Sequence, residues 1–157
     1  MPDSRLAVNI VRGNRTVLEV MRSGRIEWTR SDGVRRLARI DAARVEQVIQ
    51  ELRTGELSGG KWVGERYTGP DAEATRIVVR DGDETIVDVA SWHENFESDP
   101  RLAATATGII PLAGKTREEV LAAQPAGYQE FRRRWQRVVT LLRSLIPQDG
   151  RQQPASD

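Results

Sequence analysis

Over the first 40 positions, apolar residues recur at every second position in short runs, and residues typical of turns lie between these runs. The alternation begins in LAVNIV at 6–11, and the Gly-Asn pair at 13–14 then supplies a two-residue turn that tolerates positive φ. Further turns at 23–24 and 31–33 divide the stretch into four short strands. This spacing predicts an antiparallel meander, and its arginine-rich outward positions are typical of a sheet with one wet face.

After residue 40 the period of the apolar residues changes to that of a helix. Asp41 is a favourable N-cap, and Gly55 is a favourable residue for the C-terminal end. The sequence therefore predicts a helix over 41–54 that lies across the meander. Its apolar stripe follows the i, i+3, i+4, i+7 spacing and comprises Val45, Val48, Ile49 and Leu52.

The glycine-rich segment 56–74 separates this helix from a second β region. We expect it to form a long loop that carries Trp62 and Tyr67, and loops of this length inside a compact domain are often functional. Beyond it, apolar residues alternate over 75–92 on both sides of an Asp-Gly pair. This pattern predicts a second β-hairpin.

The last part of the chain is predicted to be helical. Residues 99–115 show no period and are expected to form an irregular crossover, after which Thr116 and Glu119 fit the capping box of a short helix. Spacings of three and four between apolar residues over 128–146 predict a long amphipathic helix. The polar stretch 148–157 is expected to be a disordered tail.

These elements predict an α+β fold in which residues 1–147 form one domain. We expect an antiparallel sheet of about five or six strands, built from the N-terminal meander and the second hairpin. The two main helices, 41–54 and 128–146, are expected to pack on one face of it. The order of elements is similar to that of several small bacterial binding domains, an analogy of fold that indicates no function.

Composition excludes several classes of protein. The chain has 157 residues, of which 38% are hydrophobic and 30% charged, which is typical of a soluble globular domain. It has no cysteine, which rules out disulfides, thiolate zinc sites and a cysteine nucleophile. No run of about 18 apolar residues predicts a membrane span, and the N-terminus does not resemble a signal peptide, so we expect a cytoplasmic protein.

Charge does not favour nucleic acid as the partner. The formal net charge is +1, and Lys61 and Lys115 are the only lysines among 24 basic residues. Arginine suits bidentate binding of phosphate or carboxylate groups, but a GC-rich genome would give the same bias. A typical DNA-binding domain is strongly basic overall, and this chain is not.

The stretch SWHENFESDP at 91–100 holds the only histidine, and His93, Glu94 and Glu97 are the candidate catalytic residues. On a helical turn His93 and Glu97 share a face, which resembles half of the His-Glu-x-x-His zinc signature. A zinc site lacks its second imidazole here, so the metal candidates His93, Glu97 and Asp99, with Glu94, fit only a carboxylate-rich Mg²⁺ or Mn²⁺ site. The alternative is an ordinary polar turn at the end of a strand, and we expect neither metal nor cofactor. Ser91 lies two residues from His93, but no Gly-x-Ser-x-Gly elbow surrounds it.

Two further groups of residues are candidates for a binding surface. The polar face of the last helix is rich in arginine, which fits a solvated face, a surface for an acidic protein or a second copy, or a phosphate contact. The aromatic residues of the long loop and of the second hairpin either line a groove or fill the core beneath the loop. The candidate binding residues are Trp62, Tyr67, Trp92, Arg132, Arg133 and Arg137.

We therefore expect a small non-enzymatic binding or regulatory domain that acts through protein–protein contacts, with another protein or a second copy as partner. This expectation follows from the aromatic loop, the arginine face and the lack of a complete catalytic motif. One alternative is a metal-dependent or acid–base hydrolase centred on His93, Glu94 and Glu97. The other is binding of phosphate or a nucleic-acid backbone by the arginine-rich C-terminal helix.

Overall fold

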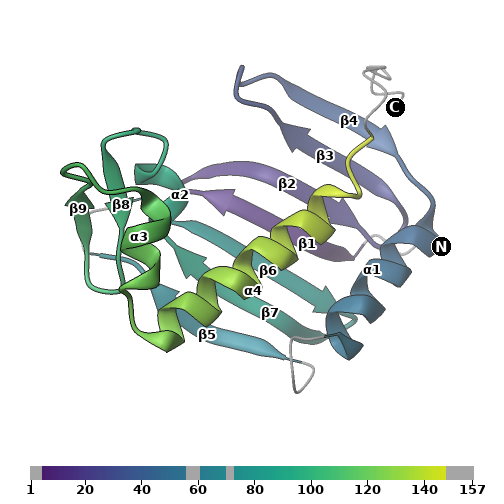
Figure 1. The fold of residues 1–157 in the computed structure, drawn as a ribbon. Coiled ribbons are helices and arrows are strands. Elements are labelled where there is room, and N and C mark those ends of the chain that lie inside the picture. The colour runs from purple at the N-terminus through teal and green to yellow at the C-terminus, as the bar shows by residue number, and fades with distance from the viewer. Residues whose placement is uncertain (1–4, 56–60, 70–72, 148–157) are drawn as a thin grey trace.

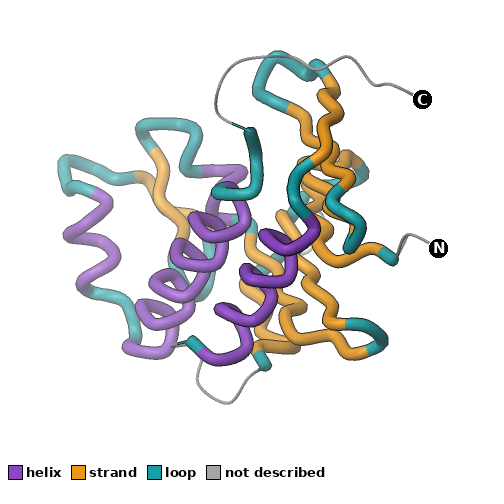
Figure 2. Tube along the Cα trace, turned by 90° about the vertical axis from the view of Figure 1, so that its right-hand side faces the viewer, coloured by secondary structure: helices purple, strands orange, loops and turns teal. Residues whose placement is uncertain are grey.

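The computed structural model describes residues 5–55, 61–69 and 73–147. They form a seven-stranded sheet, two long helices that cover one of its faces, and a small two-stranded sheet beside it (Figures 1 and 2). The fold is α+β, with a mostly antiparallel sheet and both main helices on the same face, as predicted. None of the described helices combines the length and the apolar character needed to cross a membrane.

The first four strands form the predicted meander. Glycines with positive φ occupy its turns, with φ of 62° at Gly13, 97° at Gly24 and 76° at Gly33. Gly24 is the most constrained of the three, because a Cβ atom there would lie 2.1 Å from the carbonyl oxygen of Ile40. The strands are β1 (Leu6–Arg12), β2 (Arg15–Met21), β3 (Arg25–Thr29) and β4 (Arg35–Arg39).

The first helix, α1 (Ala42–Thr54), follows the predicted boundaries. The side chain of Asp41 caps it by accepting a hydrogen bond of 3.0 Å from the backbone N–H of Ala43. At the other end the N–H of Gly55 donates to the carbonyl of Glu51, although its backbone is extended rather than left-handed. A Cβ at Gly55 would lie 2.6 Å from that carbonyl oxygen, so close approach favours glycine there.

The prediction of one continuous loop over 56–74 is wrong, because residues 62–67 form strand β5 (Trp62–Tyr67). This strand lies at the edge of the sheet and pairs in parallel with β7 (Glu84–Ser91). Its sequence, WVGERY, does not alternate, since only its first and last side chains point inward and its register shifts between Val63 and Arg66. Of the remainder of the predicted loop, residues 56–60 and 70–72 lie outside the described residues.

The second hairpin is present as predicted, with β6 (Thr75–Asp81) joined to β7 by a turn at Gly82. Strand β6 pairs with β1 and so connects the hairpin to the meander. The order across the sheet is β4-β3-β2-β1-β6-β7-β5, with more strands than the five or six predicted.

The segment after β7 contains more regular structure than predicted. A short helix, α2 (His93–Phe96), follows β7, and the predicted irregular crossover 99–115 contains β8 (Leu102–Ala104) and β9 (Ile109–Pro111), which make the small sheet. At the predicted capping box, the Thr116 hydroxyl accepts from the N–H of Glu119 at 3.1 Å. The two remaining helices are α3 (Arg117–Ala122) and α4 (Ala126–Arg143). The predicted tail, 148–157, lies outside the described residues.

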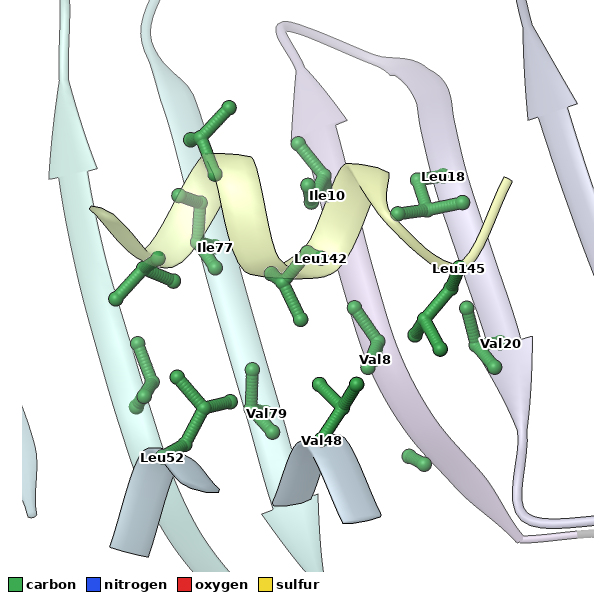
Figure 3. Packing of buried hydrophobic residues seen from close by; sticks show 14 of the residues in the cluster. Val8, Ile10, Leu18, Val20, Val48, Leu52, Ile77, Val79, Leu142 and Leu145 are labelled. Atoms are coloured by element: carbon green, nitrogen blue, oxygen red, sulfur yellow. The ribbon is translucent and has the colours of Figure 1, made fainter. Parts of the chain in front are cut away.

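The main core lies between the helix-covered face of the sheet and the two long helices (Figure 3). Each fully buried aliphatic side chain contributes about 1.5–3 kcal/mol relative to an exposed one. Of the described residues from 90 to 130, none belongs to this core cluster, so the small sheet and α3 are held by other contacts. The labelled core residues are Val8, Ile10, Leu18, Val20, Val48, Leu52, Ile77, Val79, Leu142 and Leu145.

Candidate functional site

His93 is buried at the junction of β7 and α2. Its exposed fraction is 6%, and its ring lies edge-on to Trp135 of α4, with centroids 5.1 Å apart. The Ser91 hydroxyl contacts Nδ1 of His93 and accepts that residue's backbone N–H at 3.2 Å. Burial, and secondarily the charge of Arg132, lower the histidine pKa from 6.5 to about 4. The imidazole is therefore neutral at physiological pH and is covered by protein.

Glu94 is held by two side chains from other elements. One carboxylate oxygen accepts a hydrogen bond of 3.1 Å from Nε1 of Trp135. The other lies 3.4 Å from Nη2 of Arg12, whose Nε donates to the hydroxyl of Thr75 at 3.2 Å. Glu94 thereby links α2 to both α4 and the end of β1.

Glu97 forms a bidentate pair with Arg132 of α4, at 2.7 Å and 3.0 Å. It also accepts the N–H of Ala104 at 3.1 Å, while the Tyr128 hydroxyl donates to the Ala104 carbonyl at 3.1 Å. Burial alone would raise the pKa of Glu97, but the hydrogen bonds and charge of Arg132 outweigh it, so the pKa lies below its usual value. This carboxylate stays ionised and joins the small sheet to α4.

Each acidic candidate around His93 is thus bound by its own arginine. Asp99, the third metal candidate, pairs with Arg101 at 3.0 Å. Within the described residues, no three His, Asp or Glu side chains form a group that could hold a metal ion. A general base must reach the proton that it removes from a substrate, and His93 is covered by protein.

The aromatic candidates lie mostly in the interior. Trp62 is 3% exposed and contacts Phe131, with ring centroids 5.3 Å apart. Tyr67 contacts Tyr128 and Phe131 at 4.8 Å and 4.6 Å. Trp92 is half-buried, lies 5.9 Å from Phe96 and covers Gly69. Trp62 and Tyr67 therefore attach β5 to α4, and Tyr67 also lines a shallow groove of about 540 Å³ between these two elements.

The arginines on α4 have mostly acidic partners. Arg132 is paired with Glu97, and Glu130 binds both Arg133 at 2.7 Å and Arg134 at 3.2 Å. Arg132, Arg133 and Arg137 also line a groove of about 1220 Å³ between α4 and the C-terminal end of α1. That groove is bordered by Gly55, next to the undescribed segment 56–60.

A pair of arginines on the outer hairpin has no acidic partner. Arg25 of β3 and Arg39 of β4 lie directly opposite each other on the face that the helices leave open. Both are exposed, and neither makes an ion pair or a side-chain hydrogen bond with any described residue. On the same hairpin, by contrast, Arg35 pairs with Glu27 and Arg36 with Asp32. Like charges directly opposite each other on a sheet destabilise it.

This arginine pair was not among the predicted site residues, although a signal for it exists in the sequence. The SDG turn at 31–33 sets the register of the hairpin, which places 29 opposite 35, 27 opposite 37 and 25 opposite 39. Counting back from the turn would have shown two arginines facing each other. Their lack of acidic partners depends on where the neighbouring side chains lie, which the sequence alone does not specify.

No model of a protein family, no curated protein and no solved structure matches this chain. Function is therefore inferred from the contacts and charges of the chain itself. Two kinds of polar group stand out among them. The side chains of His93, Glu94 and Glu97 have partners within the protein, and the exposed arginine pair of the outer hairpin has none among the described residues.

Proposed function

We propose that this protein is a non-enzymatic binding domain that acts through contact with an acidic, extended segment of another protein. The observation that carries the proposal is the facing pair of Arg25 and Arg39, which are exposed and have no acidic partner in the described chain. Their mutual repulsion opposes folding of the hairpin in isolation. An acidic segment beside them would replace this repulsion with attraction, and complementary charge favours specific and fast association.

The position of the pair favours an extended partner. β4 is the last strand on its side of the sheet, so no described strand pairs with its outer edge (Figure 1). An extended peptide can add to such an edge through backbone hydrogen bonds, with its alternate side chains setting specificity. Acidic residues at alternate positions of such a peptide would lie beside Arg39, on the face of the sheet that the helices leave open. Arginines on this edge also disfavour neutral strands, because charged edges resist unspecific pairing.

The contacts of the histidine cluster support a binding function over a hydrolytic one. His93 is covered by Trp135 and bonded to Ser91, and each neighbouring glutamate is held by an arginine. Such contacts make a rigid support, because breaking one of them leaves a buried or partly buried polar group without that partner.

The contacts of α4 likewise do not favour binding of phosphate by its arginine face. Arg132, Arg133 and Arg134 already bind carboxylates of the protein. A phosphate group would have to displace those carboxylates, whereas at Arg25 and Arg39 an incoming acid displaces no side chain of the described protein.

The test is a titration of isotope-labelled protein, followed by NMR, with a short peptide of alternating threonine and glutamate. We expect amide shifts concentrated in β4 and β3, and affinity that falls with added salt. Substitution Arg39→Gln, and the double change with Arg25→Gln, should weaken binding about 5- to 10-fold, consistent with one or two exposed charge pairs. Arg80→Gln is the matched control, since Arg80 is an exposed arginine of β6.

A neutral peptide of alternating threonine and glutamine distinguishes the contribution of charge to the affinity from that of backbone strand pairing. Equal affinity for this neutral peptide, or shifts that avoid β4, would contradict the proposal. Concentration-dependent dimers that form without peptide and persist in the arginine variants would assign the edge to a second copy of the chain instead.

A further inference from the structure

A cleft of about 870 Å³ opens on the helix-covered side of the sheet. It lies between the adjoining ends of β1, β2 and β3 and the C-terminal end of α4, which runs diagonally across the sheet (Figure 1). Its floor is apolar. The floor residues are Ile10, Leu18 and Trp28 from the strands, and Val139, Ile146 and Pro147 from the end of α4 and beyond it.

Arginines from three separate parts of the fold line this cleft. Arg15 begins β2, Arg30 follows β3 and Arg143 ends α4, and all three are exposed. In the part of the chain that the structure describes, none of them makes an ion pair or donates a side-chain hydrogen bond. The acid nearest to Arg30 in sequence, Asp32, is already bound by both terminal nitrogens of Arg36.

The balance of charge around the cleft is positive. Arg12 also lines it and is held in place by Glu94 and by the hydroxyl of Thr75. Glu94 is the one acidic residue among the lining residues, against four arginines. The hydroxyl groups of Thr16 and Ser31 line it too and make no side-chain hydrogen bond among the described residues.

We propose that this cleft binds a small amphipathic anion, with an apolar chain or ring on the floor and a carboxylate or phosphate group among the arginines. Clefts that take small molecules commonly measure about 300–1,000 Å³ and combine apolar walls with a few polar groups. The guanidinium fork matches carboxylate and phosphate oxygens equally well. Arginines converging on one cleft repel one another, and an anion there removes that repulsion. This site lies on the opposite side of the sheet from Arg25 and Arg39 and does not depend on the proposed protein contact.

The test uses the full chain and four probes, added below their micelle concentrations, with binding measured by calorimetry and by the shift in melting temperature. Dodecanoate and dodecyl phosphate carry the apolar chain with either acid group, and both should bind and raise the melting temperature. Dodecyltrimethylammonium has the same chain with the opposite charge and should not. Inorganic phosphate lacks the chain and should bind at least 100-fold more weakly, because it buries no methylene groups on the apolar floor.

Variants locate the binding site. Arg30→Gln and Arg143→Gln should each reduce dodecanoate affinity about 10-fold, since a hydrogen bond to a charged group contributes about 1.5 kcal/mol or more. Both residues are exposed, so the fold should tolerate the changes. Arg80→Gln, on β6, is the matched control and should leave the affinity unchanged. Binding should also alter tryptophan fluorescence, and Trp28→Phe should remove most of that change.

Three outcomes would overturn the inference. The first is equal binding of the cationic probe, and the second is dodecanoate binding that neither arginine variant weakens. The third is binding to phosphatidylglycerol vesicles without binding of monomeric dodecanoate, which would indicate a membrane surface and not a cleft. If the wild-type protein binds dodecanoate but not the acidic peptide, the result would count against the proposed function and not against this inference.

Discussion

Burial keeps His93 neutral, and this makes the stability of the protein depend on pH in a defined window. Desolvation, with a further contribution from Arg132, lowers its pKa from 6.5 to about 4 in the folded state. Between these values the unfolded chain binds a proton that the folded protein does not. Stability should therefore fall as the pH decreases from about 6.5 to about 4. At about 1.4 kcal/mol per unit, we expect a loss of about 2 kcal/mol between pH 7 and pH 5 in urea unfolding.

The variant His93→Asn tests this assignment, because it removes the titrating ring. The free energy of unfolding of this variant should depend less on pH between about 4.5 and 6.5 than that of the wild type. It should also be lower at neutral pH. Glu97 does not interfere, since its pKa lies below its usual value and its contribution is lost only at lower pH. An imidazole resonance that titrates near 6.5 in the folded protein would contradict the assignment.

Gly24 and Gly82 distinguish a steric requirement from a conformational one. Both have positive φ, of 97° and 62°, but a Cβ at Gly24 would meet the Ile40 carbonyl oxygen at 2.1 Å, whereas a Cβ at Gly82 would meet nothing within 4 Å. Gly82→Ala should therefore lower the free energy of unfolding by only about 1 kcal/mol, the cost of left-handed backbone. Gly24→Ala should cost more than about 2 kcal/mol, because the backbone has to move. Urea unfolding of both variants checks the difference, and equal losses would contradict it.

At the scale of elements, regular periodicity decided what the sequence could predict. α1 and α4 show unbroken apolar stripes, and the glycine turns mark the meander, so these elements were found. β5 was missed because a bulge separates its two inward residues, Trp62 and Tyr67, which removes the alternation that identifies a strand. Its pairing with β7 is parallel and depends on a neighbour about 25 residues away, which no local pattern specifies.

α1 is fastened to the sheet by a carboxylate that two arginines share. Asp81 accepts from Arg22 at 2.8 Å and from Arg53 of α1 at 2.6 Å. The hydrogen bond from Arg22 is the main cause of its lowered pKa. Asp81→Asn should lower stability at pH 7 by about 1–3 kcal/mol, because both arginines lose a charged partner.

This loss should depend on pH with a predictable sign. The folded pKa of Asp81 is lowered, so its contribution is present above about pH 4, the value in unfolded chains, and is lost as the pH falls through the folded pKa. Wild type and Asp81→Asn should therefore converge in stability at acid pH. Asp83→Asn, in the same hairpin turn, is the control and should change stability by less than about 0.5 kcal/mol, because that side chain is fully exposed. A difference that persists unchanged at low pH would contradict the role of the charge.

At the scale of the whole molecule, the sequence predicted the layers but not the contacts across them. Both helices lie on one face as expected, yet the partners of the histidine cluster come from distant elements. Glu97 and Arg132 are 35 residues apart, and Glu94 and Trp135 are 41 apart. Ser91 and His93 lie at alternate positions that continue the inward side of β7, a pattern that could have indicated their burial. Helix packing determines which arginine pairs with which carboxylate, and the local spacing of residues does not specify these pairs.

The same long-range contacts predict that the protein opens in two stages. The small sheet and α3 lie outside the main core cluster, and their fully buried apolar side chains are few: Ala103, Ala104 and Val120. They are attached by polar contacts, namely Glu97 to the Ala104 N–H, the Tyr128 hydroxyl to the Ala104 carbonyl, and Arg117 to the carbonyls of Leu102 and Asp99. Segments with few buried apolar contacts open at lower free energy than the core.

Native-state hydrogen exchange should therefore show two levels of protection. Amides of β1 and β6 should exchange only through global unfolding, while those of β8, β9 and α3 should exchange through a local opening of lower free energy. Tyr128→Phe removes one attachment and keeps the ring, so it should lower protection of the small sheet by about 1 kcal/mol, the typical net contribution of one hydrogen bond. Protection in β1 and β6 should fall less, because the variant keeps the buried ring and its contact with Tyr67 of β5. Equal losses in both regions would mean that the small sheet unfolds only together with the main core.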